Sequence, residues 1–256
     1  MPSYAVLGGT GNTGLSLLTI LSTSPKIQIN VYVRSRAKLL RLRPEVASNK
    51  NITVYEGDMH DVPLIRACIA GTRAVFAVVA AGDNAPGTSI ARESAHVIVS
   101  TMDELRTQDS SAPLPRVVFL SSASLSPHLC QDIPGFVQWL LHTACSNVYA
   151  DLAAAEAYLR TQQSWMNVTF IQPGGLVHDA QKGHVLSVER QKTFLSFLDL
   201  AAGMVEVADT EGEQFDWVGV SVLPTAKDVK TEWMVPVALM KGILVHFFPW
   251  MYHFLK

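Results

Sequence analysis

Three glycines near the start of the chain have the spacing of a nucleotide cradle. They lie in the stretch Gly8-Gly9-Thr10-Gly11-Asn12-Thr13-Gly14, between an apolar run and a leucine-rich helical pattern. One glycine permits a sharp turn, one lets backbone amides approach a pyrophosphate, and one lets helix and strand pack closely. The amides at the start of the helix would then hold the anion. A glycine turn without a ligand is the alternative interpretation.

Basic residues after the second expected strand bear on which dinucleotide binds. Arg34 lies about 20 positions past the glycines, where such sites meet the adenosine ribose. Arg36 and Lys38 follow, and no acid occurs before Glu45. An acid at this place binds the free 2′-hydroxyl, whereas arginine accommodates a 2′-phosphate. The sequence therefore predicts NADP (NADPH) as the cofactor, unless these bases form only a solvated face.

Further candidate cofactor residues follow the next strands. Asp58 and Met59 come shortly after an apolar run, and Asp58 either meets the adenine amino group or caps the next helix. Ala80 and Ala81 follow another apolar run, where small side chains would let the cofactor approach closely. Ligands of open parallel sheets bind outside the carboxyl ends of the strands, and Ser121 stands at such an end.

The elements that must position these residues alternate along the chain. Strand-like runs followed by helical patterns are typical of an α/β, doubly wound parallel sheet of the Rossmann type. We expect a single NAD(P)-binding domain over 1–256, with 125–150 and the small, mostly helical region 176–256 on the substrate side. Strands are expected at 4–7, 27–33, 52–55, 73–79, 117–120, 168–171 and 217–223, and helices at 61–69, 88–105, 147–160 and 198–207, the last behind a capping box from Ser196 to Asp199.

Composition narrows the class of partner. The chain has 256 residues, and 20 Lys plus Arg against 22 Asp plus Glu leave no basic block, which argues against nucleic acid and favours a small molecule. Three cysteines without metal spacing fit free thiols in a reducing compartment, and no metal is expected. The start of the chain lacks a secretory pattern, so we expect a cytoplasmic protein. The oligomeric state stays open.

The segment 233–255 is the most apolar part of the chain. It lacks acids but contains Lys241, His246, His253 and two prolines. Three interpretations remain open: a helix packed over the substrate side, peripheral membrane contact, and a membrane-spanning tail. The prolines and ionisable groups argue against the last.

These motifs together resemble an atypical short-chain dehydrogenase/reductase of the NmrA-like group, over about the first 225 residues. The glycine stretch matches that group's fingerprint, and other matching elements are Arg34, Asp58, Phe119-Leu120-Ser121-Ser122 and Gln172-Pro173-Gly174. More narrowly, segments 147–152 and 173–179 are similar to the fungal averufin oxidase A family of polyketide-pathway proteins. The resemblance implies a nicotinamide cofactor, contacted by Pro173 and Gly174, and a bulky aromatic or polycyclic substrate.

One departure from the family pattern concerns the chemistry. Active members usually carry Tyr-x-x-x-Lys, where the lysine lowers the tyrosine pKa and holds the nicotinamide ribose. Counted from Tyr149 the lysine position is Ala153, and in the register set by Glu156 the two positions are Val148 and Leu152. Neither register contains lysine.

Four side chains are candidates for catalysis. Without a lysine Tyr149 keeps a pKa near 10, which suits protonation of a carbonyl better than oxidation of an alcohol. Asp151 is an alternative base on a different face of the helix, and His142 is a candidate proton shuttle. The family serine falls on Ala123, and Ser122 stands beside it. Packing for the tyrosine and histidine, and a helix first turn for the aspartate, are the structural alternatives.

Three functions are compatible with these residues. The first is an NADP-dependent oxidoreductase, with reduction favoured, acting on a bulky aromatic or polyketide-like secondary metabolite. The second is a non-redox isomerase or cyclase that uses Tyr149, Asp151 or His142 as acid or base. The third is an NAD(P)-sensing regulator whose apolar C-terminal segment contacts a protein partner.

Overall fold

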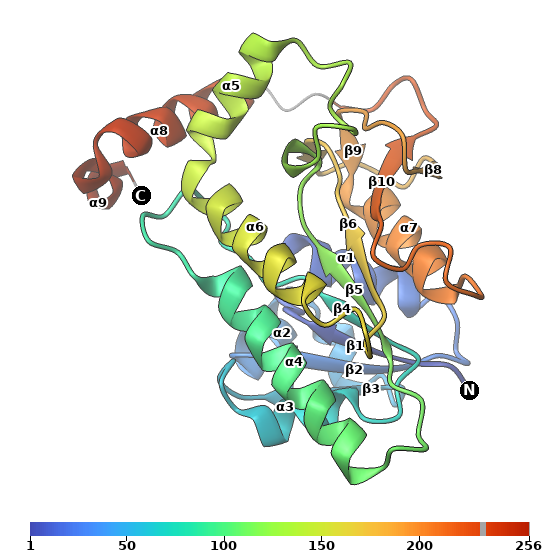
Figure 1. Ribbon diagram of the computed structural model, residues 1–256. Helices are drawn as coiled ribbons and strands as arrows, with labels where there is room; N and C mark the ends of the chain where they lie inside the picture. Colours follow the sequence, from blue (N-terminus) through green and yellow to red (C-terminus); the bar gives the residue numbers. More distant parts are fainter. Residues whose placement is uncertain (231–233, 256) are drawn as a thin grey trace.

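The computed structural model describes residues 1–230 and 234–255, and Figure 1 shows a central sheet with helices on both faces. The strand order is β3-β2-β1-β4-β5-β6-β10-β8, and every pairing is parallel except that of β8 with β10. This confirms the predicted doubly wound parallel sheet, to which β8 adds one antiparallel edge.

The strands are β1 Ser3–Leu7, β2 Gln28–Val33, β3 Ile52–Glu56, β4 Ala74–Ala77, β5 Arg116–Leu120, β6 Val168–Ile171, β7 Leu176–Val177, β8 His184–Ser187, β9 Leu195–Ser196 and β10 Gly219–Pro224. The α-helices are α1 Asn12–Leu21, α2 Arg36–Leu42, α3 Val62–Ile69, α4 Ile90–Gln108, α5 Gly135–Ala144, α6 Ser146–Arg160, α7 Phe197–Asp209, α8 Val235–Phe247 and α9 Tyr252–Leu255. Short 3₁₀ turns occupy Pro44–Ala47, Ala123–Leu125 and Pro249–Met251.

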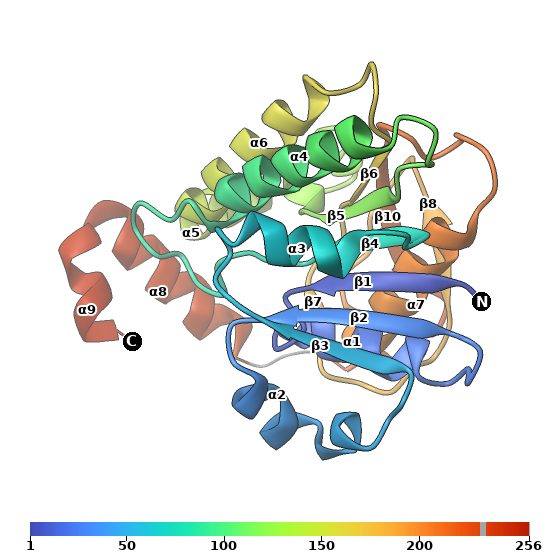
Figure 2. The same ribbon diagram turned by 90° about the horizontal axis from the view of Figure 1, so that it is seen from below.

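Two apolar layers fill the space between sheet and helices. Leu17 of α1 and Met204 of α7 belong to one layer, and Ile65 of α3, Ile98 of α4 and Leu159 of α6 belong to the other. Figure 2 shows α3, α4 and α6 on one side of the sheet and α1, α2 and α7 on the opposite side. Because both faces are covered, the central strand β4 is apolar and buried along its whole length.

The structure alters several expected boundaries. β4 ends at Ala77, so Val78 and Val79 leave the sheet. β10 begins at Gly219, after Trp217 in the left-handed region at a φ of 64°. The sequence did not predict β7, β8 or β9, because strands of two to four residues depend on a partner that only the folded chain supplies.

The C-terminal apolar segment is helical but interrupted. α8 ends at Phe247, and Pro249, which has no N–H to donate, opens a 3₁₀ turn before α9. α8 packs against α5 so closely that a Cβ at Gly242 would lie 2.0 Å from the Ala144 carbonyl oxygen. Trp233, where the expected segment begins, lies outside the described residues. Within 1–230 and 234–255 no helix has the length and apolarity needed to cross a membrane.

Candidate active site

The glycine turn has the geometry of an anion cradle. Gly8 has a φ of +100°, which favours glycine, and a Cβ at Gly14 would lie only 2.3 Å from the Gly8 carbonyl oxygen. A Cβ at Gly11 would instead meet nothing closer than 3.5 Å. Gly11 is the N-cap of α1 and supplies no side-chain cap, so no cap occupies the first-turn amides, which are the groups that bind anions at helix N-termini.

A cleft of about 330 Å³ adjoins this turn, at the switch point between β1 and β4. It contains seven of the predicted cofactor residues: Gly8, Thr10, Gly11, Arg34, Asp58, Met59 and Ala80. Eight further residues line the cleft that were not predicted as cofactor residues: Tyr32, Val33, Lys38, His60, Val78, Val79, Ile90 and Glu93. Of these, Lys38 could be noticed in the sequence as a base close to Arg34. Ile90 and Glu93 belong to α4, and only the folding of the chain brings them to the cleft.

Asp58 does not cap the following helix. The cap of α3 is Asp61, whose carboxylate accepts from the Leu64 amide at 3.1 Å, while Asp58 accepts from the amide of His60 at 3.0 Å. The Tyr32 hydroxyl donates to the Asp58 carbonyl oxygen at 2.7 Å, and burial raises the pKa of that tyrosine to about 12. Tyr32 thus holds the loop that places the Asp58 carboxylate at the cleft.

Other predicted cofactor residues lie outside this cleft. The Ser121 hydroxyl donates to buried Glu156 at 2.5 Å, which also accepts from Gln172 at 2.8 Å, so this hydroxyl joins the ends of β5 and β6. Arg36 begins α2 and its backbone amide donates to Glu56. The turn at Pro173 and Gly174 is covered by residues 191–193, since a Cβ at Gly174 would lie 2.2 Å from Gln191. Ala81 lines a second cavity instead.

That second cavity, of about 350 Å³, lies between α6, α8, α9 and the loop after β4. Its walls are mostly apolar, and Tyr149 forms part of them. Val78 to Ala80 line the cleft beside the glycine turn and Ala81 to Asn84 line this cavity, so one loop borders both spaces. Asn84 connects the walls: its amide nitrogen donates to the Gly242 carbonyl at 3.3 Å, and its oxygen accepts from the Asn147 amide at 2.8 Å.

The Tyr149 hydroxyl lies among polar groups at the end of β5. It donates to the Ser124 Oγ at 3.1 Å, and Ser122 accepts from the Ser124 amide at 3.3 Å in the 3₁₀ turn. Burial raises the Tyr149 pKa, the Cys145 thiol adds to the rise, and hydrogen bonds with Ser124 and Ser122 partly oppose it. The phenol is therefore protonated at neutral pH, and in this structure its hydroxyl donates a hydrogen bond to Ser124.

The Asp151 carboxylate, a predicted acid or base, is bonded to the start of another helix. Its two carboxylate oxygens accept from the backbone amides of Ala91 at 2.8 Å and Arg92 at 3.0 Å, and the residue is 6% exposed. Asp151 therefore caps the N-terminus of α4 from α6 and is not placed as an acid or base. The negative carboxylate also interacts favourably with the positive end of the α4 dipole.

His142 is exposed and lies beyond the cavity wall. Its ring meets the edge of the Tyr149 ring at a centroid distance of 5.4 Å, and it does not line the cavity. Leu152 is in the apolar core and Ala153 is exposed, so neither lysine register brings a cation to Tyr149.

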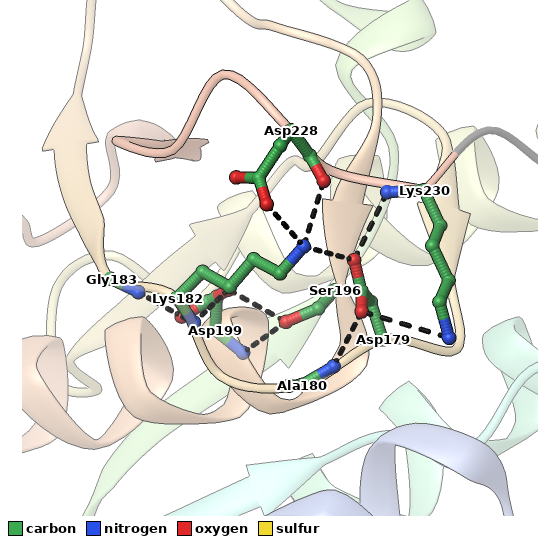
Figure 3. A network of polar contacts seen from close by, with 8 residues as sticks. All are labelled: Asp179, Ala180, Lys182, Gly183, Ser196, Asp199, Asp228 and Lys230. Carbon is green, nitrogen blue, oxygen red and sulfur yellow. Dashed lines mark hydrogen bonds and ion pairs between the residues drawn. The ribbon is translucent and has the colours of Figure 1, made fainter.

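A second polar cluster anchors the loop after β7 (Figure 3). Asp179 pairs with Lys182 at 3.0 Å and accepts from the Lys230 amide at 3.0 Å, and these contacts lower its pKa to about 2. Asp199 accepts from the amides of Lys182 and Gly183, and its own amide donates to Ser196 at 2.9 Å. The predicted Ser196 cap of α7 is confirmed. The cluster holds the loop in place.

The sequence model of a family described as NAD(P)H-binding matches residues 8–211, a range that contains the glycine turn, the cleft and Tyr149. The chain belongs to this NAD(P)H-binding family. Oxidoreductase ordB of Dothistroma septosporum is 50% identical over 99% of this chain and 95% of its own. Oxidoreductase stcQ of Emericella nidulans is 48% identical over 100% of this chain and 94% of its own. Oxidoreductase aflX of Aspergillus parasiticus is 46% identical over 99% and 95%.

A solved structure of low sequence identity has the same architecture. A short-chain dehydrogenase/reductase from Veillonella parvula in complex with NADP superposes with a TM-score of 0.68 at 18% identity, over 91% of this chain and 99% of that one. At that identity the likeness extends to the fold alone. The family match and the full-length fungal relatives confirm the predicted NAD(P)-binding oxidoreductase.

Proposed function

We propose that the protein is an NADPH-dependent reductase for a carbonyl or conjugated system of a bulky aromatic, polyketide-like metabolite. The observation that carries the proposal is the position of Tyr149. Tyr149 lines an apolar cavity that shares one loop with the cleft beside the glycine turn, and its hydroxyl is bonded to Ser124. A substrate in the cavity would lie next to a dinucleotide in the cleft.

The residues of the cleft suit a phosphorylated dinucleotide. The open amides at the start of α1 fit a pyrophosphate, and the cations of Arg34 and Lys38 line the side where a ribose 2′-phosphate would lie. The Asp58 carboxylate lines the cleft and would accept from an adenine amino group, while Tyr32 bonds the backbone carbonyl oxygen of Asp58. NADPH, when bound, supplies the hydride.

Tyr149 would protonate the substrate oxygen. The half-buried phenol holds its proton at neutral pH, and its hydroxyl would turn from Ser124 to donate that proton to the substrate oxygen. With no lysine to lower its pKa, the tyrosine is a better acid in reduction than a base in oxidation. We therefore place Ser122 and Ser124 beside it as orienting groups rather than as proton donors.

The cavity accounts for the proposed substrate class. The lining residues of α6, α8 and α9 fall in the regions 125–150 and 176–256 assigned to the substrate side, whereas the loop after β4 lies outside both regions. The walls are mostly apolar. A planar polycyclic compound would bury its rings there, while its carbonyl met Tyr149. The resemblance to fungal polyketide-pathway proteins supports such a compound.

A cyclase or isomerase is less favoured, because Asp151 caps a helix and His142 does not line the cavity.

The reductase is tested by following NADPH absorbance with a panel of aromatic ketones, quinones and partly reduced polycyclic ketones. Oxidation of NADPH that needs both protein and one of these compounds is expected. Conversion of the same compounds without cofactor turnover would overturn the reductase, and tight NADPH binding without conversion of any aromatic carbonyl would favour the regulator.

A further inference from the structure

Exposed aromatic side chains gather at one end of the molecule. Figures 1 and 2 both show α5, α8 and α9 together at that end, away from most of the sheet. We call this surface the aromatic end and define it by the exposed residues of these segments: Phe136, Val137, Trp139, Met234, Met240, Phe247, Phe248, Trp250 and Phe254. The largest exposed fractions are 78% for Phe254, 70% for Phe136 and 65% for Trp250.

Such a patch is costly in water without a partner. Soluble proteins seldom leave so many large apolar groups together, and patches of this kind mark contact sites. The rings also meet one another: Phe136 stacks with Trp139, and Trp250 lies edge-to-face with Phe254. The side chains of α8 that face inward already pack on α5 and line the cavity, so folding of the described chain does not bury the outer ones.

The charges of the same segments point to the kind of partner. The ranges 135–144 and 234–255 contain Lys241, His142, His246 and His253 but no aspartate or glutamate. All four of these basic side chains are exposed. Tryptophan and phenylalanine with nearby bases are the side chains that lie in the headgroup region of anionic bilayers.

A second copy of this chain fits the surface less well. A two-fold contact would place the same patch against itself, and therefore bases against bases without an acid from these segments to pair with them. An anionic lipid surface supplies the missing negative charge.

We propose that the aromatic end docks on an anionic lipid bilayer, with Trp250 and Phe254 inserted at the headgroup level and Lys241 near the phosphates. No spanning helix is required. Because α8 and α9 also line the apolar cavity, docking would bring that cavity close to lipid, where an apolar substrate dissolves. The inference does not depend on the proposed reductase activity.

The experiment is co-sedimentation of the full chain with vesicles. We expect sedimentation with equal parts of phosphatidylcholine and phosphatidylserine, little with phosphatidylcholine alone, and release at high salt, since charge screening weakens the lysine contribution. Trp250→Ser combined with Phe254→Ser should lower the affinity by roughly tenfold or more. These two residues do not line the cavity.

The matched control is Leu42→Ser combined with Val185→Ser, which removes exposed apolar groups of α2 and β8. It should sediment like the original chain. Circular dichroism and the thermal midpoint check that both double variants fold. Equal loss in the control pair, or sedimentation with neither vesicle, would overturn the proposal. So would light scattering that shows a dimer broken by the Trp250 and Phe254 changes while vesicles stay unbound.

Discussion

The Oγ of Ser124 accepts a hydrogen bond from the hydroxyl of Tyr149 at 3.1 Å, which joins the 3₁₀ turn after β5 to the first turn of α6. The pair stands where the family pattern predicts a serine and a tyrosine, although the serine is one position later than the register that falls on Ala123. Two segments separated by 25 residues thus meet at the apolar cavity.

Replacing Tyr149 with phenylalanine should lower NADPH-dependent turnover by roughly 10² to 10⁴, because the substrate oxygen loses its proton donor. NADPH affinity should stay unchanged, since the hydroxyl is bonded to Ser124 and not to a cleft residue. Turnover is followed at the nicotinamide absorbance. Tyr158→Phe, on the same helix but stacked on His96, is the control and should keep its turnover. Equal rates for Tyr149→Phe and the original chain would remove Tyr149 from the mechanism.

Replacing Arg34 with alanine should weaken NADPH binding by roughly tenfold to a hundredfold and leave NADH binding nearly unchanged, because a charged hydrogen bond to the 2′-phosphate is lost. Fluorescence titration of both cofactors measures the effect. Arg36→Ala is the matched control, since Arg36 does not line the cleft. An equal loss of affinity for NADPH and NADH would show that Arg34 does not bind the 2′-phosphate.

The glycine turn should respond differently at two positions. Gly14→Ala puts a methyl group 2.3 Å from the Gly8 carbonyl oxygen, so we expect a loss of about 1–3 kcal/mol of stability. Gly11→Ala meets nothing closer than 3.5 Å and should cost about 1 kcal/mol or less, yet its methyl group would obstruct the pyrophosphate. Chemical denaturation and NADPH titration separate the two effects. Normal NADPH affinity in Gly11→Ala would place the cofactor elsewhere.

Replacing Asp151 with asparagine should destabilise the protein without removing chemistry. Only one of its two side-chain polar atoms can still accept from α4, so about 1–2 kcal/mol of stability should be lost. Thermal unfolding measures this loss. The control is Asp103→Asn, which breaks the exposed ion pair of Asp103 with Arg106 on α4 and should cost about 0.5 kcal/mol or less. If Asp151→Asn instead abolished turnover in a fully folded protein, the capping role would be insufficient.

The Asp179 cluster should contribute to acid stability. The pKa of Asp179 is lowered from 3.8 to about 2 by the Lys230 amide and by Lys182, so its contribution is full above pH 3.8. As pH falls from there towards 2, the folded state loses this advantage because the unfolded chain binds the proton more readily. Asp179→Asn should therefore be less stable than the original chain at neutral pH, and the difference in free energy of unfolding should disappear below about pH 2. A difference that persists undiminished in acid would exclude this linkage.

Much of the fold could be predicted because its signals are local. The strand 168–171 was predicted with the bounds that the structure has, and the Ser196 cap of α7 was read from neighbouring residues. What could not be predicted is contact between side chains and segments that are far apart in the sequence. Asp151 follows a helix start, where an acid is unremarkable, and nothing nearby in sequence indicates that its carboxylate meets α4, about 60 residues earlier.

Local patterns were enough to predict the Rossmann architecture, the glycine cradle and the base at Arg34, because glycine spacing and strand-helix alternation act over a few residues. Which side chains lie in the same cleft or contact depends on the folded chain. Folding brought Ile90 and Glu93 into the cleft, paired Tyr149 with Ser124, directed Ser121 to Glu156, and placed α8 against α5. These contacts depend on how distant segments pack, and packing is a property of the whole chain.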